Sequence, residues 1–312
     1  MTLRQVGTSD MMVAPLALGG NVFDFTADEK ASFEVLDAFV DAGGSMIDTA
    51  DVYSAWAPGH VGGESERLIG RWLKRDPAKR DRVVIATKVG FMGGLAPDTI
   101  APACDASLER MGIDRIDLYY QHKDDDSVPL ADSLGAFDQL LGAGKIRAIG
   151  LSNFTAPRVE EALAVGIANG FTLPVALQPW YNLVEREKFE GALSEVALGQ
   201  GLSVFPYYSL ANGFLTGKYR SKGDLDKSVR GLRNIEYLEG RGPRVLAALD
   251  AVAADTGASL ATVALAWTKV QPGITAPIAS ATSLDQFRDL AAALTLDLTP
   301  GQIEVLDRAS ED

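Results

Sequence analysis

Cysteine and histidine are scarce in this chain of 312 residues. It contains one cysteine, Cys104, and two histidines, His60 and His122. A single cysteine cannot form an intramolecular disulfide, and so few thiol and imidazole groups provide no cluster for zinc or an iron–sulfur centre. The composition therefore predicts a protein without a metal site or a disulfide framework.

Long apolar runs and an excess of positive charge are also missing. No uninterrupted apolar stretch approaches the roughly 18 residues of a membrane-spanning helix, and the N-terminal segment lacks the apolar core of a signal peptide. The chain has 29 Lys and Arg residues against 42 Asp and Glu residues, a formal net charge of -13. Since nucleic acid and anionic lipid repel an acidic surface, we expect a protein that binds neither nucleic acid nor membranes. With one cysteine and no signal or membrane-spanning segment, the expected location is the cytoplasm.

The remaining composition is that of a globular protein with a large core. Hydrophobic residues make up 47% and charged residues 23% of the chain. This length permits two domains, but α/β barrels often exceed about 250 residues as one domain. Because no linker, low-complexity tract or repeat divides the chain, residues 1–312 are expected to form a single domain. No motif specifies an oligomeric state.

Short apolar runs alternate with amphipathic segments along most of the chain. The runs are nearly continuous in hydrophobicity, which is typical of strands covered on both faces. The predicted strands are residues 13–20, 45–50, 83–89, 116–122, 146–152, 175–181, 202–208 and 274–280. The predicted helices between them include residues 28–42, 64–74, 97–111, 130–141, 156–168 and 185–198. Eight such units predict a closed (β/α)8 barrel, a TIM barrel, with an open doubly wound sheet as the alternative.

Some segments fall outside this repeat. Residues 1–12 are predicted to form a short β-hairpin that caps the bottom of the barrel. Residues 212–242 are long, polar and basic in parts, and long irregular loops of this kind are usually functional or disordered. Residues 243–256 and 300–311 are predicted to be extra C-terminal helices.

Polar side chains stand at the C-terminal ends of successive predicted strands. Asp48 ends the second strand and Tyr53 follows it, Lys88 lies at the end of the third, and His122 ends the fourth. Each residue by itself has a structural explanation, such as a turn cap for Asp48 or a satisfied buried imidazole for His122. In a barrel, however, these ends meet at one face, where chemistry gathers. The series continues with Ser152, Asn153, Gln178, Tyr207 and Tyr208.

These residue types suit the reduction of a carbonyl group. A phenol with a pKa of about 10 is a weak acid at neutral pH. An ammonium about 4 Å away is worth roughly 4 kcal/mol, or about three pKa units, so Lys88 is expected to lower the pKa of Tyr53 toward about 7. Asp48 would orient Lys88 and keep it charged, and a neutral His122 would stabilise the developing alkoxide.

Six motifs in one order carry a family resemblance. They are IDTADVYS at 47–54, ATKVG at 86–90, DLYYQH at 117–122, IGLSNF at 149–154, LQPWYN at 177–182 and YYSLANGFLTGKY at 207–219. With them the chain resembles the aldo-keto reductase superfamily over nearly its whole length. The resemblance implies a (β/α)8 barrel, ordered binding of NADPH and transfer of the pro-R hydride to a small aldehyde or ketone. The implied catalytic residues are Asp48, Tyr53, Lys88 and His122.

The resemblance also implies how a nicotinamide cofactor is held. Residues 218–233 would fold over the dinucleotide. The implied binding residues are Ser152, Asn153 and Gln178 for the carboxamide, Tyr207 for the nicotinamide ring, and Leu210, Gly213 and Lys218 for the pyrophosphate.

At the eighth strand the resemblance points to one branch of the superfamily. Many members place Lys and Arg where this chain has Ser280 and Gln286, and those cations hold the 2′-phosphate. The branch that includes the potassium-channel β subunits reads G-x-S-x-x-x-Q-x-x-E-N and is similar to an NADP binder. Thr282, Gln286 and Asp289 match that pattern, whereas Ser280 replaces Gly and Leu290 replaces Asn. NADP is therefore the expected cofactor, with NAD as the alternative.

Substrate and biological role stay open at this level. Phe23, Trp56, Phe91 and Trp180 are expected to form the walls of a pocket for aromatic aldehydes or sugar-like carbonyls, although core packing explains such aromatic residues equally well. The complete catalytic set is also compatible with a regulatory subunit that binds NADP(H), senses redox state and turns over slowly.

Overall fold

Parallel strands close the predicted barrel. The computed structural model describes residues 1–311, and its main sheet has the order β10-β3-β4-β5-β6-β7-β8-β9. The strands are β3 Ala17–Gly19, β4 Met46–Asp48, β5 Val84–Val89, β6 Ile116–Gln121, β7 Ile146–Ser152, β8 Ala176–Gln178, β9 Ser203–Val204 and β10 Ile278–Ala279. Backbone hydrogen bonds from Thr275 N to Val204 O (2.8 Å) and from Ile278 N to Pro206 O (2.9 Å) join the two ends of the sheet. The open-sheet alternative is therefore wrong.

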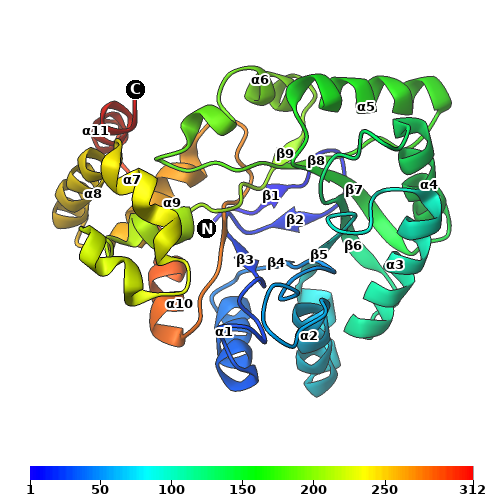
Figure 1. Ribbon diagram of the computed structural model, residues 1–312, viewed down its shortest axis with the longest axis horizontal. Coiled ribbons are helices and arrows are strands. Elements are labelled where there is room, and N and C mark those ends of the chain that lie inside the picture. Colours follow the sequence, from blue (N-terminus) through cyan, green and yellow to red (C-terminus); the bar gives the residue numbers. More distant parts are fainter. Residues whose placement is uncertain (312) are drawn as a thin grey trace.

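Helices surround the barrel, as Figure 1 shows. Those packed around the strands are α1 Glu29–Asp41, α2 Glu64–Arg75, α3 Pro97–Met111, α4 Leu130–Gly142, α5 Ala156–Asn169, α6 Ala192–Gly199, α9 Leu260–Val270 and α10 Leu284–Ala292. The predicted C-terminal additions are α8 Gly242–Thr256 and α11 Pro300–Ser310. The segment predicted at 185–198 is divided into the 3-10 helix η2 Arg186–Lys188 and α6, because Gly191 before α6 has a φ of 91°. A further 3-10 helix, η1 Pro77–Arg82, precedes β5.

Helix α9 was not predicted, because it shows no amphipathic pattern. Every residue from Ala261 to Lys269 is buried, since α9 packs against both α8 and α10. A helix that is apolar all round has no polar stripe to mark it in the sequence. Within residues 1–311 no single helix is long and apolar enough to cross a membrane. Helices α8 and α9 have the required length and hydropathy only when taken together, and they are bent by 98° where they meet.

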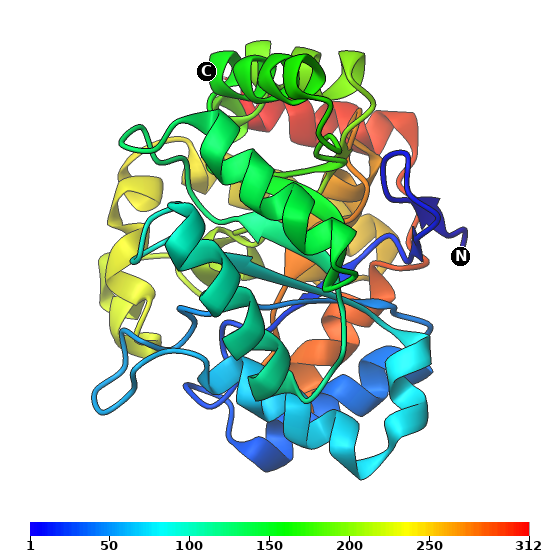
Figure 2. The same cartoon turned by 90° about the vertical axis from the view of Figure 1, so that its right-hand side faces the viewer.

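The N-terminal hairpin closes one end of the barrel, as predicted. Its strands, β1 Arg4–Gln5 and β2 Met12–Val13, pair antiparallel. The side chains of Val6 and Met11 are buried in one hydrophobic cluster with barrel residues such as Leu118. Figure 2 shows the hairpin on the opposite side of the molecule from residues 211–239. The hairpin therefore leaves the C-terminal ends of the strands free.

Residues 211–239 form short helices where a long irregular loop was expected. They are η3 Ala211–Thr216, η4 Lys222–Lys227, η5 Gly231–Asn234 and α7 Ile235–Glu239. Local hydrogen bonds stabilise these short helices, and such bonds leave no periodic pattern of apolar residues in the sequence. Asp224 Oδ2 accepts from Arg220 N at 2.9 Å and from Ser221 N at 2.8 Å, and Tyr219 OH lies 2.5 Å from Ser228 Oγ.

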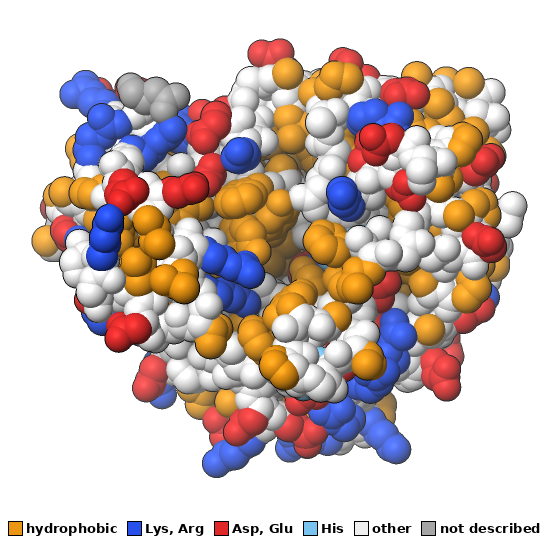
Figure 3. Space-filling view, viewed as in Figure 1, with side chains coloured by type: hydrophobic (Ala, Val, Ile, Leu, Met, Phe, Trp, Pro, Cys, Tyr) orange, Lys and Arg blue, Asp and Glu red, His pale blue; other side chains and the backbone are white. Residues whose placement is uncertain are grey.

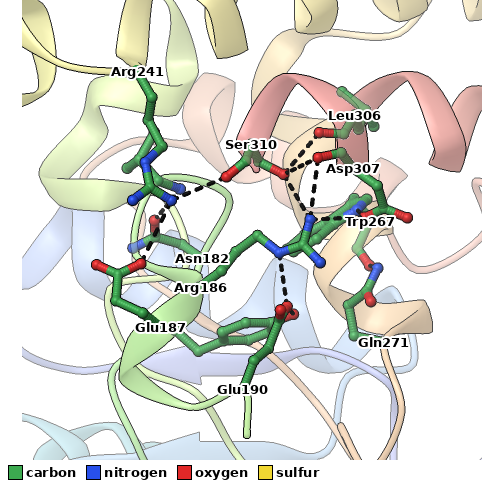
Figure 4. A network of polar contacts seen from close by, with 12 residues as sticks. Asn182, Arg186, Glu187, Glu190, Arg241, Trp267, Gln271, Leu306, Asp307 and Ser310 are labelled. Atoms are coloured by element: carbon green, nitrogen blue, oxygen red, sulfur yellow. Dashed lines mark hydrogen bonds and ion pairs between the residues drawn. The ribbon is translucent and has the colours of Figure 1, made fainter. Parts of the chain in front are cut away.

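A network of polar contacts ties α11 to the segment that follows β8 (Figure 4). Arg186 Nη1 donates to Ser310 Oγ at 2.9 Å and lies 3.3 Å from Asp307 Oδ1, while its Nε donates to Glu190 Oε1 at 2.8 Å. Trp267 Nε1 of α9 donates to the same Asp307 oxygen at 2.9 Å. The network holds the C-terminal helices against the chain that leads from β8 to α6.

Candidate active site

A buried ion pair lies at the C-terminal ends of β4 and β5. Lys88 Nζ is 2.7 Å from Asp48 Oδ2, and both side chains are almost completely buried. The same ammonium donates to Thr49 O at 2.7 Å and to Tyr53 OH at 3.0 Å. The Tyr53 hydroxyl in turn donates to Asp48 Oδ2 at 3.4 Å. The three side chains assigned to proton transfer therefore touch one another.

Strand register explains this meeting. Asp48 of β4 pairs with Ala86 of β5, so Lys88, two residues further on, points to the same interior face. From the other side of the barrel, Gln178 Nε2 donates to Asp48 Oδ1 at 2.9 Å. Both carboxylate oxygens thus accept hydrogen bonds, which offsets the cost of burying the charge.

The protonation of Tyr53 differs from the expectation. Its hydroxyl sits on the buried ion pair, and this burial raises the pKa of the phenol well above its usual value, with the Asp48 carboxylate adding to the effect. Burial also lowers the pKa of Lys88, against the opposing effect of Asp48. The predicted lowering of the Tyr53 pKa is wrong, because it counted one ammonium where the structure has a buried and neutralised pair. Tyr53 therefore keeps its proton at neutral pH.

His122 lies beside this phenol with a neutral ring. Burial and the nearby Lys88 ammonium hold the pKa of His122 well below its usual value. Its Nδ1 has no hydrogen-bond partner within residues 1–311. Its ring centroid is 6.0 Å from that of Tyr53 and 4.9 Å from that of Phe91. A neutral imidazole here suits the expected role of hydrogen-bond donor to a substrate oxygen.

The ends of the neighbouring strands add a connected set of hydroxyl and amide groups. Ser152 Oγ donates to Gln178 O at 3.0 Å, and Asn153 Nδ2 donates to His122 O at 2.8 Å. Tyr207 OH donates to Asn153 Oδ1 at 2.7 Å. The structure therefore brings these four residues, all expected to hold a nicotinamide, together beside His122.

Unusual backbone geometry is concentrated at the same face. Outside glycine, positive φ angles occur at six positions in residues 1–311, of which Asp24 is one. The other five lie in the segments that follow β4, β7 and β9: Ser54, Asn153, Tyr208, Ala211 and Asn212. Such conformations cost free energy and cluster at functional sites, so their distribution supports this face as the site.

The segment after Tyr208 makes a turn at Gly213, where the absence of a Cβ leaves room beside the backbone. Gly213 follows Leu210 and Asn212 with a φ of 90°, and a Cβ there would lie 3.0 Å from Lys218 Nζ. The ammonium therefore lies directly over this backbone. Asn212 Oδ1 is buried and unpartnered in the described chain. A cation held over a turn with positive φ fits a phosphate group, as the pyrophosphate assignment requires.

The residues expected at the 2′-phosphate lie at the N-terminus of α10. Gln286 Oε1 accepts from Thr282 N at 3.0 Å and from Thr282 Oγ1 at 3.1 Å. This arrangement leaves the Gln286 amide nitrogen as a donor for a ligand. Ser280 Oγ instead donates to Asn21 Oδ1 at 2.7 Å, and Leu290 is buried in the core.

Three of the four expected wall residues contact aromatic rings of the candidate site. Ring centroids are 6.0 Å apart for Trp56 and Tyr53, 4.9 Å for Phe91 and His122, and 5.3 Å for Trp180 and Tyr208. Figure 3 shows a hollow at the centre of this face with hydrophobic side chains on its walls. The prediction that Phe23 forms part of the pocket wall is wrong. Its side chain is fully buried in the hydrophobic core and does not face the hollow.

One arginine beside Tyr208 received no individual role from the sequence. Arg233 Nη1 donates to Tyr208 OH at 3.4 Å. Its signal was the basic run SVRGLRN at 228–234. Its position depends on the short helices of residues 211–239, which the sequence pattern did not predict.

The fold and this site define an α/β-barrel oxidoreductase, and comparison with known proteins agrees. Residues 15–311 match the model of the Aldo/keto reductase family. The chain therefore belongs to this family, as its motifs implied.

Similar proteins include two reductases and a channel subunit. Aldo-keto reductase str7 of Strobilurus tenacellus is 30% identical over 317 residues, which cover 99% of this chain and 90% of that protein. Aldo-keto reductase YhdN of Bacillus subtilis (strain 168) is 34% identical over 273 residues, which cover 82% and 76%. A probable voltage-gated potassium channel subunit beta of Oryza sativa subsp. japonica is 30% identical over 324 residues, which cover 99% and 95%.

Proposed function

We propose that this protein is an NADPH-dependent reductase of aldehydes and ketones, with Tyr53 as the proton donor. The observation that carries the proposal is the contact of the Tyr53 hydroxyl with Lys88 Nζ at 3.0 Å and with Asp48 Oδ2 at 3.4 Å. Reduction of a carbonyl group needs a hydride at carbon and a proton at oxygen. The nicotinamide, when bound, supplies the hydride, and the phenol supplies the proton.

The raised pKa of Tyr53 suits the direction of reduction. A phenol that holds its proton at neutral pH is ready to donate it as negative charge develops on the substrate oxygen. Lys88, which donates a hydrogen bond to the phenol oxygen, would then stabilise the phenolate that remains. Asp48 positions Lys88, and neutral His122 would donate to the same substrate oxygen.

The residues at the strand ends fit a dinucleotide. Lys218 over Gly213 suits a pyrophosphate, and the Gln286 amide nitrogen suits a 2′-phosphate. Because Gln286 stands where an arginine would add charge, we expect NADP to be preferred and NAD to be tolerated. The nicotinamide end would be held by Ser152, Asn153, Gln178 and Tyr207.

The walls of the hollow and the single thiol bear on the substrate and the cellular setting. Trp56, Phe91 and Trp180 offer flat apolar surface beside Tyr53, which suits aromatic aldehydes or sugar-like carbonyls. The one cysteine, Cys104, is a buried free thiol, which is compatible with the cytoplasmic location that we propose.

A second candidate is a regulatory subunit that binds NADP(H) and turns over slowly. The observation in its favour is the 30% identity to a probable channel subunit beta, together with Thr282 and Gln286 at the start of α10. The two candidates differ in steady-state turnover.

The test is NADPH oxidation by the purified protein with benzaldehyde, followed by absorbance, beside the Tyr53→Phe variant. We expect turnover to fall by about a hundredfold or more in the variant, as for loss of a general acid. NADPH binding, measured by quenching of tryptophan fluorescence, should stay near wild type. Turnover retained in Tyr53→Phe would contradict the proton donor. Binding without turnover across a panel of aldehydes and sugars would favour the regulatory subunit.

A further inference from the structure

The Lys88 ammonium uses all three of its protons in hydrogen bonds. Nζ donates to Asp48 Oδ2 at 2.7 Å, to Thr49 O at 2.7 Å and to Tyr53 OH at 3.0 Å. The side chain is completely buried, and an ammonium has three donors and no acceptor. Two acceptors therefore hold the ammonium from the protein side, and their positions decide where its third N–H bond points. That third bond reaches the proposed proton donor.

A contact outside the barrel wall holds Thr49. Because side chains alternate along a strand, Thr49 faces away from the interior that Asp48 faces, toward α2. Its Oγ1 lies 2.7 Å from Oγ of Ser65, the second residue of α2, and both side chains are fully buried. Ser65 Oγ donates its one proton to Gly20 O at 2.8 Å. The Thr49 hydroxyl is therefore the donor in the contact with Ser65.

Further hydrogen bonds close this network on the ion pair. Gly20, which follows β3, donates from its backbone N–H to Asp48 O at 2.7 Å, and Thr49 N donates to Ala86 O at 2.8 Å. A Cβ on Gly20 would lie 2.7 Å from Ser65 Oγ and 3.2 Å from Asp48 O, so a larger residue would displace these bonds. The backbone of residues 48–49 is thus held from β3, β5 and α2 together. Connected buried networks of this kind fix one geometry.

Packing alone does not require the two hydroxyls. Where a buried helix meets a strand, replacing both members of a hydrogen bond by apolar groups of similar shape is close to neutral for stability. What the pair of hydroxyls adds is a defined position of the peptide whose carbonyl accepts from Lys88 Nζ.

We propose that Thr49 and Ser65 are positioning residues for proton transfer. Through the bond between their hydroxyls they place the Thr49 carbonyl so that Lys88 points its third N–H at the Tyr53 oxygen. The inference rests on the proposed reductase function and adds residues that do not touch the reacting atoms. When the Tyr53 proton moves to the substrate oxygen, negative charge develops on the phenol oxygen, and an N–H bond already aimed at it stabilises this charge without reorganisation. Misplacement by about 1 Å can cost roughly a hundredfold in rate.

The experiment removes each hydroxyl and follows proton transfer. Thr49→Val keeps nearly the same shape without the hydroxyl, Ser65→Ala removes its partner, and Thr49→Ser keeps the hydroxyl. Reduction of benzaldehyde by NADPH is measured in H2O and in D2O. In Thr49→Val and Ser65→Ala we expect kcat/KM to fall by about fivefold or more, as for one lost hydrogen bond. The solvent isotope effect should rise, because proton transfer limits the rate more, while NADPH affinity should stay unchanged. Thr49→Ser should restore both values.

A control separates positioning from a loss of folded protein. Thr268→Val in α9 also removes a fully buried hydroxyl, whose Oγ1 donates to Ala264 O at 3.0 Å within the same helix. It should keep kcat/KM per folded molecule and the isotope effect of the wild type. If Thr49→Val and Ser65→Ala behave like Thr268→Val, the network is only structural and the proposal is overturned.

Failure of the reductase function itself has a different result. If the wild type reduces no carbonyl compound, urea unfolding of a double-mutant cycle decides the positioning role. Thr49→Val should destabilise the wild type and have a much smaller effect in Lys88→Met, because residues of one network do not contribute additively. Equal effects in the two backgrounds would show that Thr49 acts independently of Lys88 and would refute the proposal.

Discussion

Lys88 and Asp48 form an ion pair of 2.7 Å between Nζ and Oδ2 inside the barrel, away from solvent. The pair neutralises itself, and the Tyr53 hydroxyl bonds to both partners. The consequence is a phenol that stays protonated instead of one poised near neutral pH. In the reaction that we propose, Lys88 would therefore act on the phenolate after proton transfer more than on the phenol before it.

Removing the cation should unbalance this pair. In Lys88→Met the Asp48 carboxylate stays buried without its counter-ion, and we expect a loss of about 3–5 kcal/mol in the free energy of unfolding. Reductase turnover should also fall to a small fraction of wild type. Urea unfolding and NADPH oxidation measure the two effects. The double variant Asp48→Asn, Lys88→Met should regain much of the stability and none of the activity. Unchanged stability in the single variant would show that the pair is not charged.

Asp51 should make stability depend on pH. Its Oδ1 has no partner in residues 1–311, and burial raises its pKa to about 7, with Glu66 adding to the effect. The pKa of Asp in the unfolded chain is about 3.9. Between about pH 4 and about pH 7 the folded protein therefore keeps a proton on Asp51 that the unfolded chain has lost. This group therefore costs stability progressively as the pH rises from about 4 to about 7, by roughly 4 kcal/mol in total.

The variant Asp51→Asn removes that titration at nearly constant size. We expect it to be more stable than wild type at pH 8 and close to wild type at pH 4, measured by urea unfolding. Asp226→Asn, an exposed aspartate in η4, is the control and should follow the wild type at both values. If the wild type and Asp51→Asn show parallel pH dependence, the carboxyl group is not buried as the structure has it.

The turn at Gly213 should be sensitive to a single methyl group. In Gly213→Ala the new Cβ meets Lys218 Nζ at 3.0 Å in a backbone with a φ of 90°, so we expect weaker NADPH binding and a loss of stability of about 1–2 kcal/mol. Gly170→Ala is the matched control, because it has a φ of 68° and nothing within 4 Å. It should lose similar stability and bind NADPH as the wild type does. Equal NADPH affinity in both variants would place the pyrophosphate elsewhere.

Cofactor preference should respond to Gln286. An arginine there adds a cation at the start of α10, and we expect Gln286→Arg to tighten NADPH relative to NADH by about tenfold, the value of a charge-assisted hydrogen bond. Dissociation constants for both cofactors measure this. Gln302→Arg is the control, because Gln302 occupies the same capping position in α11, where its Oε1 accepts from Thr299 N at 2.9 Å. An equal gain for NADPH and NADH would move the 2′-phosphate away from α10.

Much of the fold and the site was readable from local sequence. Apolar runs and amphipathic segments predicted all eight barrel strands, because hydrophobic period is set by the geometry of each element alone. Placing Asp48, Lys88 and His122 together needed only the rule that parallel strands end at one face, and the structure confirms that they meet. Helix α9 was not predicted, because a helix buried on all sides shows no alternation of apolar and polar residues in the sequence.

By itself, then, the sequence determined the barrel, the order of its strands and which polar residues share one face, since these depend on short-range pattern. Only the tertiary structure decided the charge state of that face, because the pKa of Tyr53 depends on burial and on the 2.7 Å pairing of Lys88 with Asp48. It also decided that Phe23 is buried in the hydrophobic core. Those outcomes depend on contacts between distant segments, and no local pattern encodes the distance between them.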